Sequence, residues 1–168
     1  MKYIAIVGTN ANLSYNRKLL FFLQNYFNDK AEIDVVDIKN IPMFNEDRPL
    51  PNVIKQLAEK IDQADGVIFG VPEYDHSIPS SLKSLVEWLS WQIHPLKDRP
   101  IMLVGTSLGN LGSARAQQHL RQILDSPGIG AAVMPGNEFL LGFAESQFSN
   151  DGSIKDQKTI DFLTQCFN

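Results

Sequence analysis

The fold of this chain is decided by residues 4–16, which read IAIVGTNANLSYN. Four consecutive apolar residues end at Gly8 and predict a strand that is buried on both faces, as strands of parallel sheets are. Ser14 follows in a polar loop and precedes a helical pattern over residues 16–27. A buried strand, a polar loop and a helix therefore open the chain in the order that is typical of an α/β protein.

The same alternation of strand and helix continues along the chain. Further strands are predicted at 33–38, 66–71, 100–104 and 131–141, the last one broken near Pro135-Gly136. Further helices are predicted at 53–64, 79–92, 113–124 and 156–167, with Pro79 as the first residue of its helix. This order predicts one domain over residues 1–168, with helices on both faces of a five-stranded parallel sheet.

Composition and charge exclude several classes of protein. The 168 residues are 43% hydrophobic and 20% charged, which is ordinary for a globular domain. With 15 basic and 19 acidic residues the formal net charge is −4, and no basic stripe is present, so we expect no nucleic-acid partner. The single cysteine, Cys166, excludes an intrachain disulfide and a multi-cysteine metal site. No signal peptide or membrane-length apolar run is present, so we expect a cytoplasmic protein with no membrane partner and no metal.

Three polar loops follow strands one, three and four, which are neighbours in the strand order 2-1-3-4-5. Ligands of such sheets bind beyond the carboxyl ends of the strands. The first loop, 8–16, offers Thr9, Ser14 and Asn16 beside a helix N-terminus, a combination that suits a phosphate. The alternative is that Ser14 or Asn16 only caps the helix. The dinucleotide pattern G-x-G-x-x-G is absent from this loop.

The second and third loops favour a planar ligand. Loop 71–79 holds Tyr74 between prolines, which gives a flat face beside backbone donors and acceptors; the alternative is a plain strand-to-helix connection capped by Ser77. Loop 105–113 contains three glycines, which allow backbone to approach a ligand closely.

The third loop also matches the nucleophile elbow of hydrolases. Residues 105–109 read G-x-S-x-G, which would make Ser107 the nucleophile, followed along the chain by an acid and then a histidine. The only histidine after Ser107 is His119, and none follows Asp125, so the required order fails. The sequence therefore disfavours a hydrolase.

The motifs of these loops resemble those of the NADPH-dependent FMN reductase family, flavoproteins that include quinone and azo-dye reductases. Residues 8–16 are similar to the pattern Gly-Ser-x-Arg-x-x-Ser-x-Asn of that family. Residues 72–83 read PEYDHSIPSSLK and are similar to Pro-Glu-Tyr-Asn-x-Ser-x-Pro-Gly-x-Leu-Lys. Residues 105–120 resemble the glycine-rich third motif and its helix, so that the resemblance covers nearly the whole chain.

The resemblance implies a flavodoxin-like three-layer sandwich that binds FMN and uses NADPH or NADH as co-substrate. The reduced flavin would pass its electrons to a small acceptor, such as a quinone, an azo compound or free flavin. Because the flavin carries the chemistry, we expect no side-chain acid or nucleophile to be essential. The residues that the resemblance and the loops assign to the cofactor are Thr9, Ser14, Tyr15, Asn16, Pro72, Glu73, Tyr74, Asp75, Thr106, Ser107 and Gly109.

Three positions depart from the family pattern: Ala11 replaces Arg, Asp75 replaces Asn and Ser80 replaces Gly. The loss of a forked cation at position 11 bears on how a phosphate is held, and Arg17 or Lys18 is the candidate replacement. Two alternatives to the enzyme stay open. One is a flavodoxin-like electron carrier without nicotinamide turnover, and the other is a flavin-less ligand-binding member.

Other residues carry weaker expectations. The helix over 79–92 is apolar almost all round, which favours a partner surface, although a wholly buried helix would read the same. The resemblance likewise implies a homodimer or homotetramer. His76 could touch a ligand by its position, whereas His94, His119 and Cys166 are read as structural or solvated.

Overall fold

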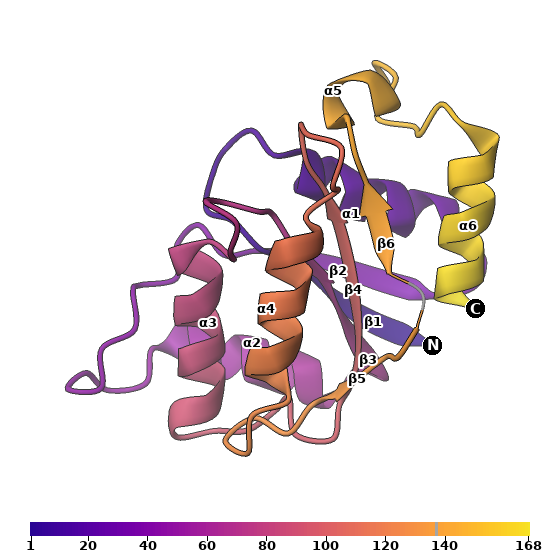
Figure 1. Ribbon diagram of the computed structural model, residues 1–168. Helices are drawn as coiled ribbons and strands as arrows, with labels where there is room; N and C mark the ends of the chain where they lie inside the picture. Colours follow the sequence, from indigo (N-terminus) through magenta and orange to yellow (C-terminus); the bar gives the residue numbers. More distant parts are fainter. Residues whose placement is uncertain (137) are drawn as a thin grey trace.

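The computed structural model describes residues 1–136 and 138–168, and it contains one parallel sheet at its centre (Figure 1). The strands lie in the order β2-β1-β3-β4-β5, which confirms the predicted topology. Their bounds are β1 Lys2–Val7, β2 Glu32–Asp37, β3 Gly66–Gly70, β4 Pro100–Thr106, β5 Ala132–Val133 and β6 Phe139–Leu141.

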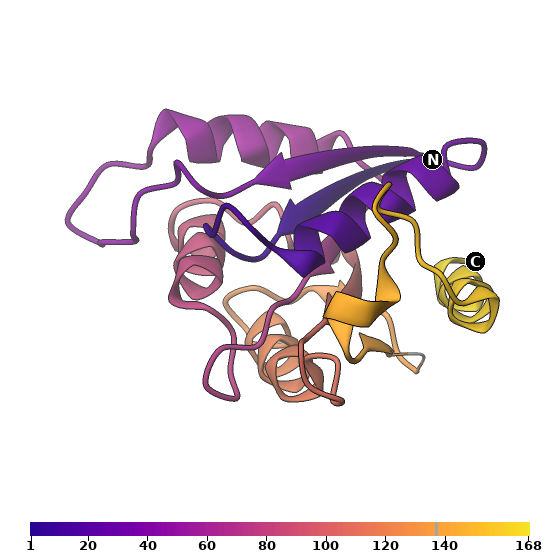
Figure 2. The same ribbon diagram turned by 90° about the horizontal axis from the view of Figure 1, so that it is seen from above.

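Helices cover both faces of the sheet. Their bounds are α1 Tyr15–Tyr26, α2 Asn52–Asp62, α3 Ser80–Trp91, α4 Ala114–Leu124, α5 Ala144–Gln147 and α6 Gln157–Phe167. One apolar cluster joins α1 and α6 to one face of the strands, and a second joins α2, α3 and α4 to the other face. Figure 2 shows this separation from above, with α1 and α6 apart from the other three long helices. The short helix α5 has no counterpart among the predicted elements.

The fifth position of the sheet holds two short strands, as the break at Pro135-Gly136 predicted. The first, β5, pairs with the start of β4 at Pro100 and Ile101. The second, β6, pairs with the end of β4 from Val104 to Thr106. Asn137 lies between them, outside the described residues. Two short strands, β5 and β6, therefore pair with successive parts of β4, and β6 reaches the carboxyl edge of the sheet.

Most of the apolar surface of α3 is buried within the chain itself. Leu82, Leu85, Val86, Trp88 and Leu89 are all at most 1% exposed within this single chain. The loop between β2 and α2 packs on α3, since the Trp88 indole N–H donates to the Pro42 carbonyl at 2.8 Å. Most of the apolar side chains of this helix therefore serve the chain's own core, while Trp91 at its end stays 46% exposed. Pro79 occupies the position before the first helical residue, one place earlier than predicted.

Two glycines let the strand ends come together. A side-chain carbon at Gly8 would lie 2.5 Å from the Gly70 carbonyl oxygen, and one at Gly105 would lie 1.9 Å from the Ser113 hydroxyl. Both distances are too short for any Cβ atom, so larger residues would push β1, β3 and α4 apart. Gly105 thus serves packing within the chain, where the sequence suggested contact with a ligand. Among the described residues, no helix has the length and apolar content to cross a membrane.

Candidate functional site

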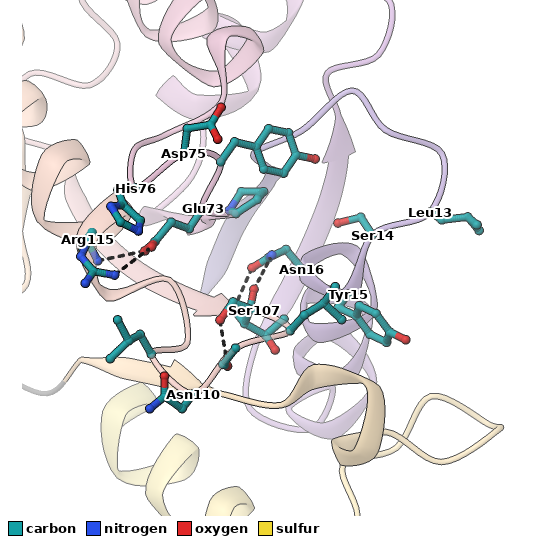
Figure 3. Close-up of a pocket in the computed structure, with 16 residues that line it drawn as sticks. Leu13, Ser14, Tyr15, Asn16, Glu73, Asp75, His76, Ser107, Asn110 and Arg115 are labelled. Carbon is teal, nitrogen blue, oxygen red and sulfur yellow. Dashed lines mark hydrogen bonds and ion pairs between the residues drawn. The ribbon is translucent and has the colours of Figure 1, made fainter.

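A pocket of about 610 Å³ lies beyond the carboxyl ends of β1, β3 and β4. Its walls come from the three predicted loops, which Figure 3 shows converging on one space. A cavity of this volume is within the usual range for sites that bind small molecules and cofactors. The position at the carboxyl edge is where open α/β sheets bind their ligands.

The structure brings nearly all of the predicted cofactor residues to this pocket. Those that line it are Ser14, Tyr15, Asn16, Pro72, Glu73, Tyr74, Asp75, Thr106, Ser107 and Gly109. Thr9 is the exception, because it is 1% exposed and lies behind Tyr74. The loops were therefore placed correctly, while the task of individual side chains within them differs from the expectation at several positions.

Thr9 supports the wall of the pocket. Its hydroxyl lies 2.9 Å from the Tyr74 hydroxyl and accepts the Ala11 backbone N–H at 3.1 Å. These contacts fix the Tyr74 ring against the first loop and hold the turn at Ala11. In this structure Thr9 thus positions Tyr74 and the turn at Ala11, and its predicted contact with phosphate stays a prediction.

Asn16 joins the first loop to the third. It is 4% exposed, and its amide donates to the Thr106 carbonyl at 2.9 Å while its carbonyl accepts the Thr106 N–H at 3.0 Å. Thr106 in turn donates its hydroxyl to the Leu141 carbonyl. Both side chains face the pocket but use their polar atoms within the protein, so neither is a free phosphate donor in this structure.

Glu73 joins the second loop to the start of α4. Its carboxylate accepts the backbone N–H groups of Arg115 at 3.0 Å and of Ala116 at 3.2 Å, and it lies 3.7 Å from the Arg115 guanidinium. The residue at the N-cap of α4, Ser113, has a left-handed backbone and makes no side-chain cap. A carboxylate from another loop therefore supplies the cap and meets the positive end of the helix dipole.

The first turn of α1 forms the remaining wall. Ser14 caps the helix by accepting the Arg17 N–H at 3.2 Å, and it also lines the pocket. The first backbone N–H groups of an α-helix have no partner inside the helix, and here they lie at the pocket edge with Ser14 and Tyr15. An anion would be stabilised at this position by these donors and the helix dipole.

Neither candidate replacement for the missing Arg at position 11 reaches into the pocket. Arg17 forms a forked ion pair with Asp37, at 2.6 and 3.1 Å, and donates to the Asn12 carbonyl at 2.8 Å. The Lys18 ammonium lies 5.1 Å from the centre of the Tyr15 ring. Arg17 therefore supports the first loop from behind, through its backbone.

Six lining residues were not assigned to the cofactor from the sequence: Leu13, His76, Leu108, Asn110, Leu111 and Arg115. Leu13 and Leu108 are 94% and 67% exposed, which gives the mouth of the pocket an apolar border. The sequence could have indicated both leucines as lining residues, because they lie inside loops 8–16 and 105–113. Arg115 stood in the quoted third motif, but only the fold places it opposite Glu73.

The hydrolase alternative finds no support in the geometry. The Ser107 hydroxyl donates to the Gly109 carbonyl at 3.1 Å. The His119 Nδ1 lies 3.0 Å from the Ser77 hydroxyl, in the second loop. Because the downstream histidine is paired elsewhere, Ser107 lacks the adjacent base that a nucleophilic serine requires.

The pocket fits the cofactor that the motifs imply. The N-terminus of α1 could accept a phosphate. The space between the Pro72–Asp75 loop and the Thr106–Gly109 loop could accept a planar ring. A side chain at Gly109 would meet no atom within 4 Å, so the third loop leaves open room at that position. Cys166 is 3% exposed and lines a separate apolar cavity of about 260 Å³, where burial raises the pKa of its thiol. The chain's one thiol is thus distant from this chemistry.

Comparisons with known proteins agree with this assignment. The family model described as NADPH-dependent FMN reductase matches residues 1–146. The NADH:(hydroxy)cinnamate reductase subunit CrdA of Vibrio ruber is 47% identical over 99% of this chain and 84% of its own length. The NADH-dependent flavin reductase subunit 2 of Lactobacillus johnsonii is 45% identical over 100% of this chain and 94% of its own length.

A solved structure gives the same result for the fold. The flavoenzyme NAD(P)H:(acceptor) oxidoreductase FerB from Paracoccus denitrificans superimposes with a TM-score of 0.87. It is 28% identical, and the match covers 98% of this chain and 91% of that one. With the motifs, the pocket and the family match in agreement, the chain belongs to the NADPH-dependent FMN reductase family.

Proposed function

We propose that this protein is an FMN-dependent NAD(P)H oxidoreductase that reduces a small acceptor, such as a quinone, an azo compound or free flavin. The observation that carries the proposal is the pocket itself, in which a helix N-terminus, a tyrosine-bearing loop and a glycine-rich loop converge. Bound FMN would supply the chemistry by taking a pair of electrons from the nicotinamide and passing it on.

The chain's own residues bind and orient. The start of α1, with Ser14 and Tyr15, holds the phosphate end, while Pro72 and Tyr74 present a surface to the ring. Thr9, Asn16 and Glu73 hold the three loops at fixed separations through their hydrogen bonds. A site held in this way needs little rearrangement when the cofactor binds, which preserves binding energy.

The arrangement of the basic side chains favours NADH over NADPH as the electron donor. Position 11 is Ala, Arg17 is paired with Asp37, and Arg115 is paired with Glu73, so the extra phosphate of NADPH has no unpaired partner among these side chains. We therefore propose that NADH is the preferred donor. The names of the Vibrio ruber and Lactobacillus johnsonii relatives specify NADH.

Replacement of Ala11 by Arg tests this preference. The variant Ala11→Arg should bind FMN or NADPH more tightly, by about tenfold, because a forked cation gains roughly 1.5 kcal/mol from a phosphate. Titration calorimetry with FMN, NADH and NADPH measures the effect, and Ala11→Gln serves as a control of similar bulk without the charge. Unchanged dissociation constants for both FMN and NADPH would contradict the role given to position 11.

We also propose that the chain forms a homodimer or homotetramer in the cytoplasm. Exposed apolar side chains support an interface: Trp91 at the end of α3 is 46% exposed, and Met43 in the loop that packs on α3 is 56% exposed. Light scattering at micromolar concentration should give two or four times the 18.8 kDa chain mass. A monomeric mass would contradict the proposed oligomer. Recovery of the protein outside the cytoplasmic fraction would contradict the proposed location.

Binding of FMN is the direct test of the proposed function. The purified protein, stripped of any cofactor and mixed with FMN, should quench flavin fluorescence to an endpoint of one FMN per chain. It should then oxidise NADH in the presence of a quinone. A protein that binds no FMN would support the flavin-less alternative, and one that binds FMN without oxidising NADH or NADPH would support the electron carrier.

A further inference from the structure

His76 occupies a backbone conformation that a histidine rarely adopts. It follows Asp75 in a two-residue hairpin turn. The φ angle is 49° at Asp75 and 63° at His76. The hairpin is closed by two backbone hydrogen bonds between Tyr74 and Ser77, at 2.9 and 3.0 Å. Two successive positive φ angles define a type I′ turn, in which Asn-Gly is the favoured pair. The histidine is thus held in a place where a glycine would be less strained.

The hairpin is anchored on both sides, so that His76 has a fixed position at the pocket. On the N-terminal side of the hairpin turn, Glu73 is hydrogen-bonded to the first turn of α4, and Tyr74 is hydrogen-bonded to Thr9. After it, the Ser77 hydroxyl lies 3.0 Å from His119 of α4. Strained residues that the surroundings hold in place cluster at functional sites. Figure 3 shows the His76 ring between Asp75 and Arg115 on one wall of the pocket.

Among the lining side chains, only His76 is of the type that exchanges a proton near neutral pH. The other titratable groups of the lining are Tyr15, Tyr74, Glu73, Asp75 and Arg115. Tyrosine and arginine keep their protons at neutral pH, and free carboxylates have lost theirs. The glycine-rich loop opposite contributes Thr106, Ser107, Leu108, Asn110 and Leu111, which carry no charge. The groups that can carry charge around His76 are therefore Asp75, the Glu73–Arg115 pair and His119, which pairs with the adjacent Ser77.

We propose that His76 is the proton donor to the reduced acceptor, an inference that rests on the proposed function. A quinone gains two electrons and two protons when it becomes a hydroquinone. NAD(P)H supplies the electron pair and one proton through the bound cofactor. The second proton leaves an N–H of the His76 imidazolium and forms the O–H bond on the acceptor's oxyanion, and water then reprotonates the imidazole. This step adds a catalytic side chain where the sequence led us to expect none.

Two acceptors separate proton donation from electron transfer. Benzoquinone requires protons, whereas ferricyanide takes electrons only. His76→Asn keeps a residue that tolerates the left-handed turn and removes the exchangeable proton. It should lower the rate with benzoquinone about 10²-fold at pH 6, the lower end of what general acids contribute. The rate with ferricyanide and the anaerobic reduction by NADH should stay unchanged. His94→Asn, an exposed histidine outside the pocket, is the matched control.

The pH profile and an equilibrium measurement complete the test. The benzoquinone rate of the native protein should fall as the pH rises, and this dependence should be absent in His76→Asn. Binding of 2,4-dinitrophenolate, a phenolate that stays ionised at pH 6, should be about tenfold weaker in His76→Asn when it is followed by absorbance without turnover.

Either of two results would overturn the role of His76. One is an unchanged benzoquinone rate in His76→Asn, and the other is an equal loss with ferricyanide, which would mean that the residue only shapes the site. A native protein that binds no FMN, or is not reduced by NADH or NADPH, would instead contradict the proposed function.

Discussion

Asn16 uses both of its polar atoms on the backbone of one residue, Thr106. Its type and place also suit a phosphate ligand, and the same is true of Thr9. A side-chain amide or hydroxyl can serve a ligand or a neighbouring loop equally well, and its residue type does not distinguish the two. The sequence therefore predicted which loops form the site, while the partners of each side chain depend on distances that only the fold sets.

Replacement of Asn16 by Ala should destabilise the protein by about 2–4 kcal/mol, because the N–H and C=O of Thr106 would be buried without partners. Urea unfolding measures this loss. Asn25→Ala, an exposed asparagine on the same helix, is the control and should change the free energy of unfolding by less than about 0.5 kcal/mol. A loss for Asn16→Ala as small as that of the control would contradict the link between the first and third loops.

Replacement of Glu73 by Ala should cost about 1–2 kcal/mol of folding free energy, since α4 would lose its carboxylate cap. Glu73→Gln keeps an oxygen acceptor but not the charge, so its loss should be smaller. Thermal unfolding of both variants, compared with Glu59→Ala on the exposed face of α2, measures the cap. Equal losses in Glu73→Gln and Glu73→Ala would mean that charge rather than hydrogen bonding is responsible.

At the scale of elements, every long helix and every strand was predicted, and most ends agree within two residues. Periodic apolar patterns in buried strands and amphipathic helices supply that signal. The sequence could not show how much of α3 is covered within the chain, because the loop that packs on it, which contains Pro42 and Phe44, has no periodicity of its own. The short helix α5 spans one turn and is too short to show a pattern.

The start of α6 gives a prediction about pH. Hydrogen bonds from the Thr159 hydroxyl and backbone N–H hold the pKa of Asp156 below its usual value. A carboxyl group with a lowered pKa in the folded state stabilises the fold above its unfolded pKa, and this contribution is lost as the pH falls through the folded value. The stability difference between native protein and Asp156→Ala should therefore be full at pH 7 and shrink below about pH 4.

Urea unfolding between pH 7 and pH 2.5 checks the role of Asp156. Asp29→Ala, which replaces an exposed aspartate in the turn after α1, is the control and should show no such narrowing with pH. A difference for Asp156→Ala that stays constant down to pH 2.5 would contradict the carboxylate cap of α6.

At the scale of the whole molecule, three loops from distant parts of the chain close into a ring. Thr9 with Tyr74 ties the first loop to the second, Glu73 ties the second to the start of α4 after the third, and Asn16 with Thr106 ties the third to the first. The parallel order of β1, β3 and β4 brings these loops to one edge. The molecule therefore has a preformed pocket whose net charge is not basic, in which a helix N-terminus and loop dipoles would hold an anionic cofactor.

An anaerobic titration of the FMN-loaded protein with NADH, followed by visible absorbance, tests the proposed oxidoreductase activity directly. The protein should be yellow, lose its flavin absorbance with one equivalent of NADH and regain it when a quinone is added. A protein that stays colourless after incubation with FMN, or one that stays yellow with excess NADH and NADPH, would contradict that activity.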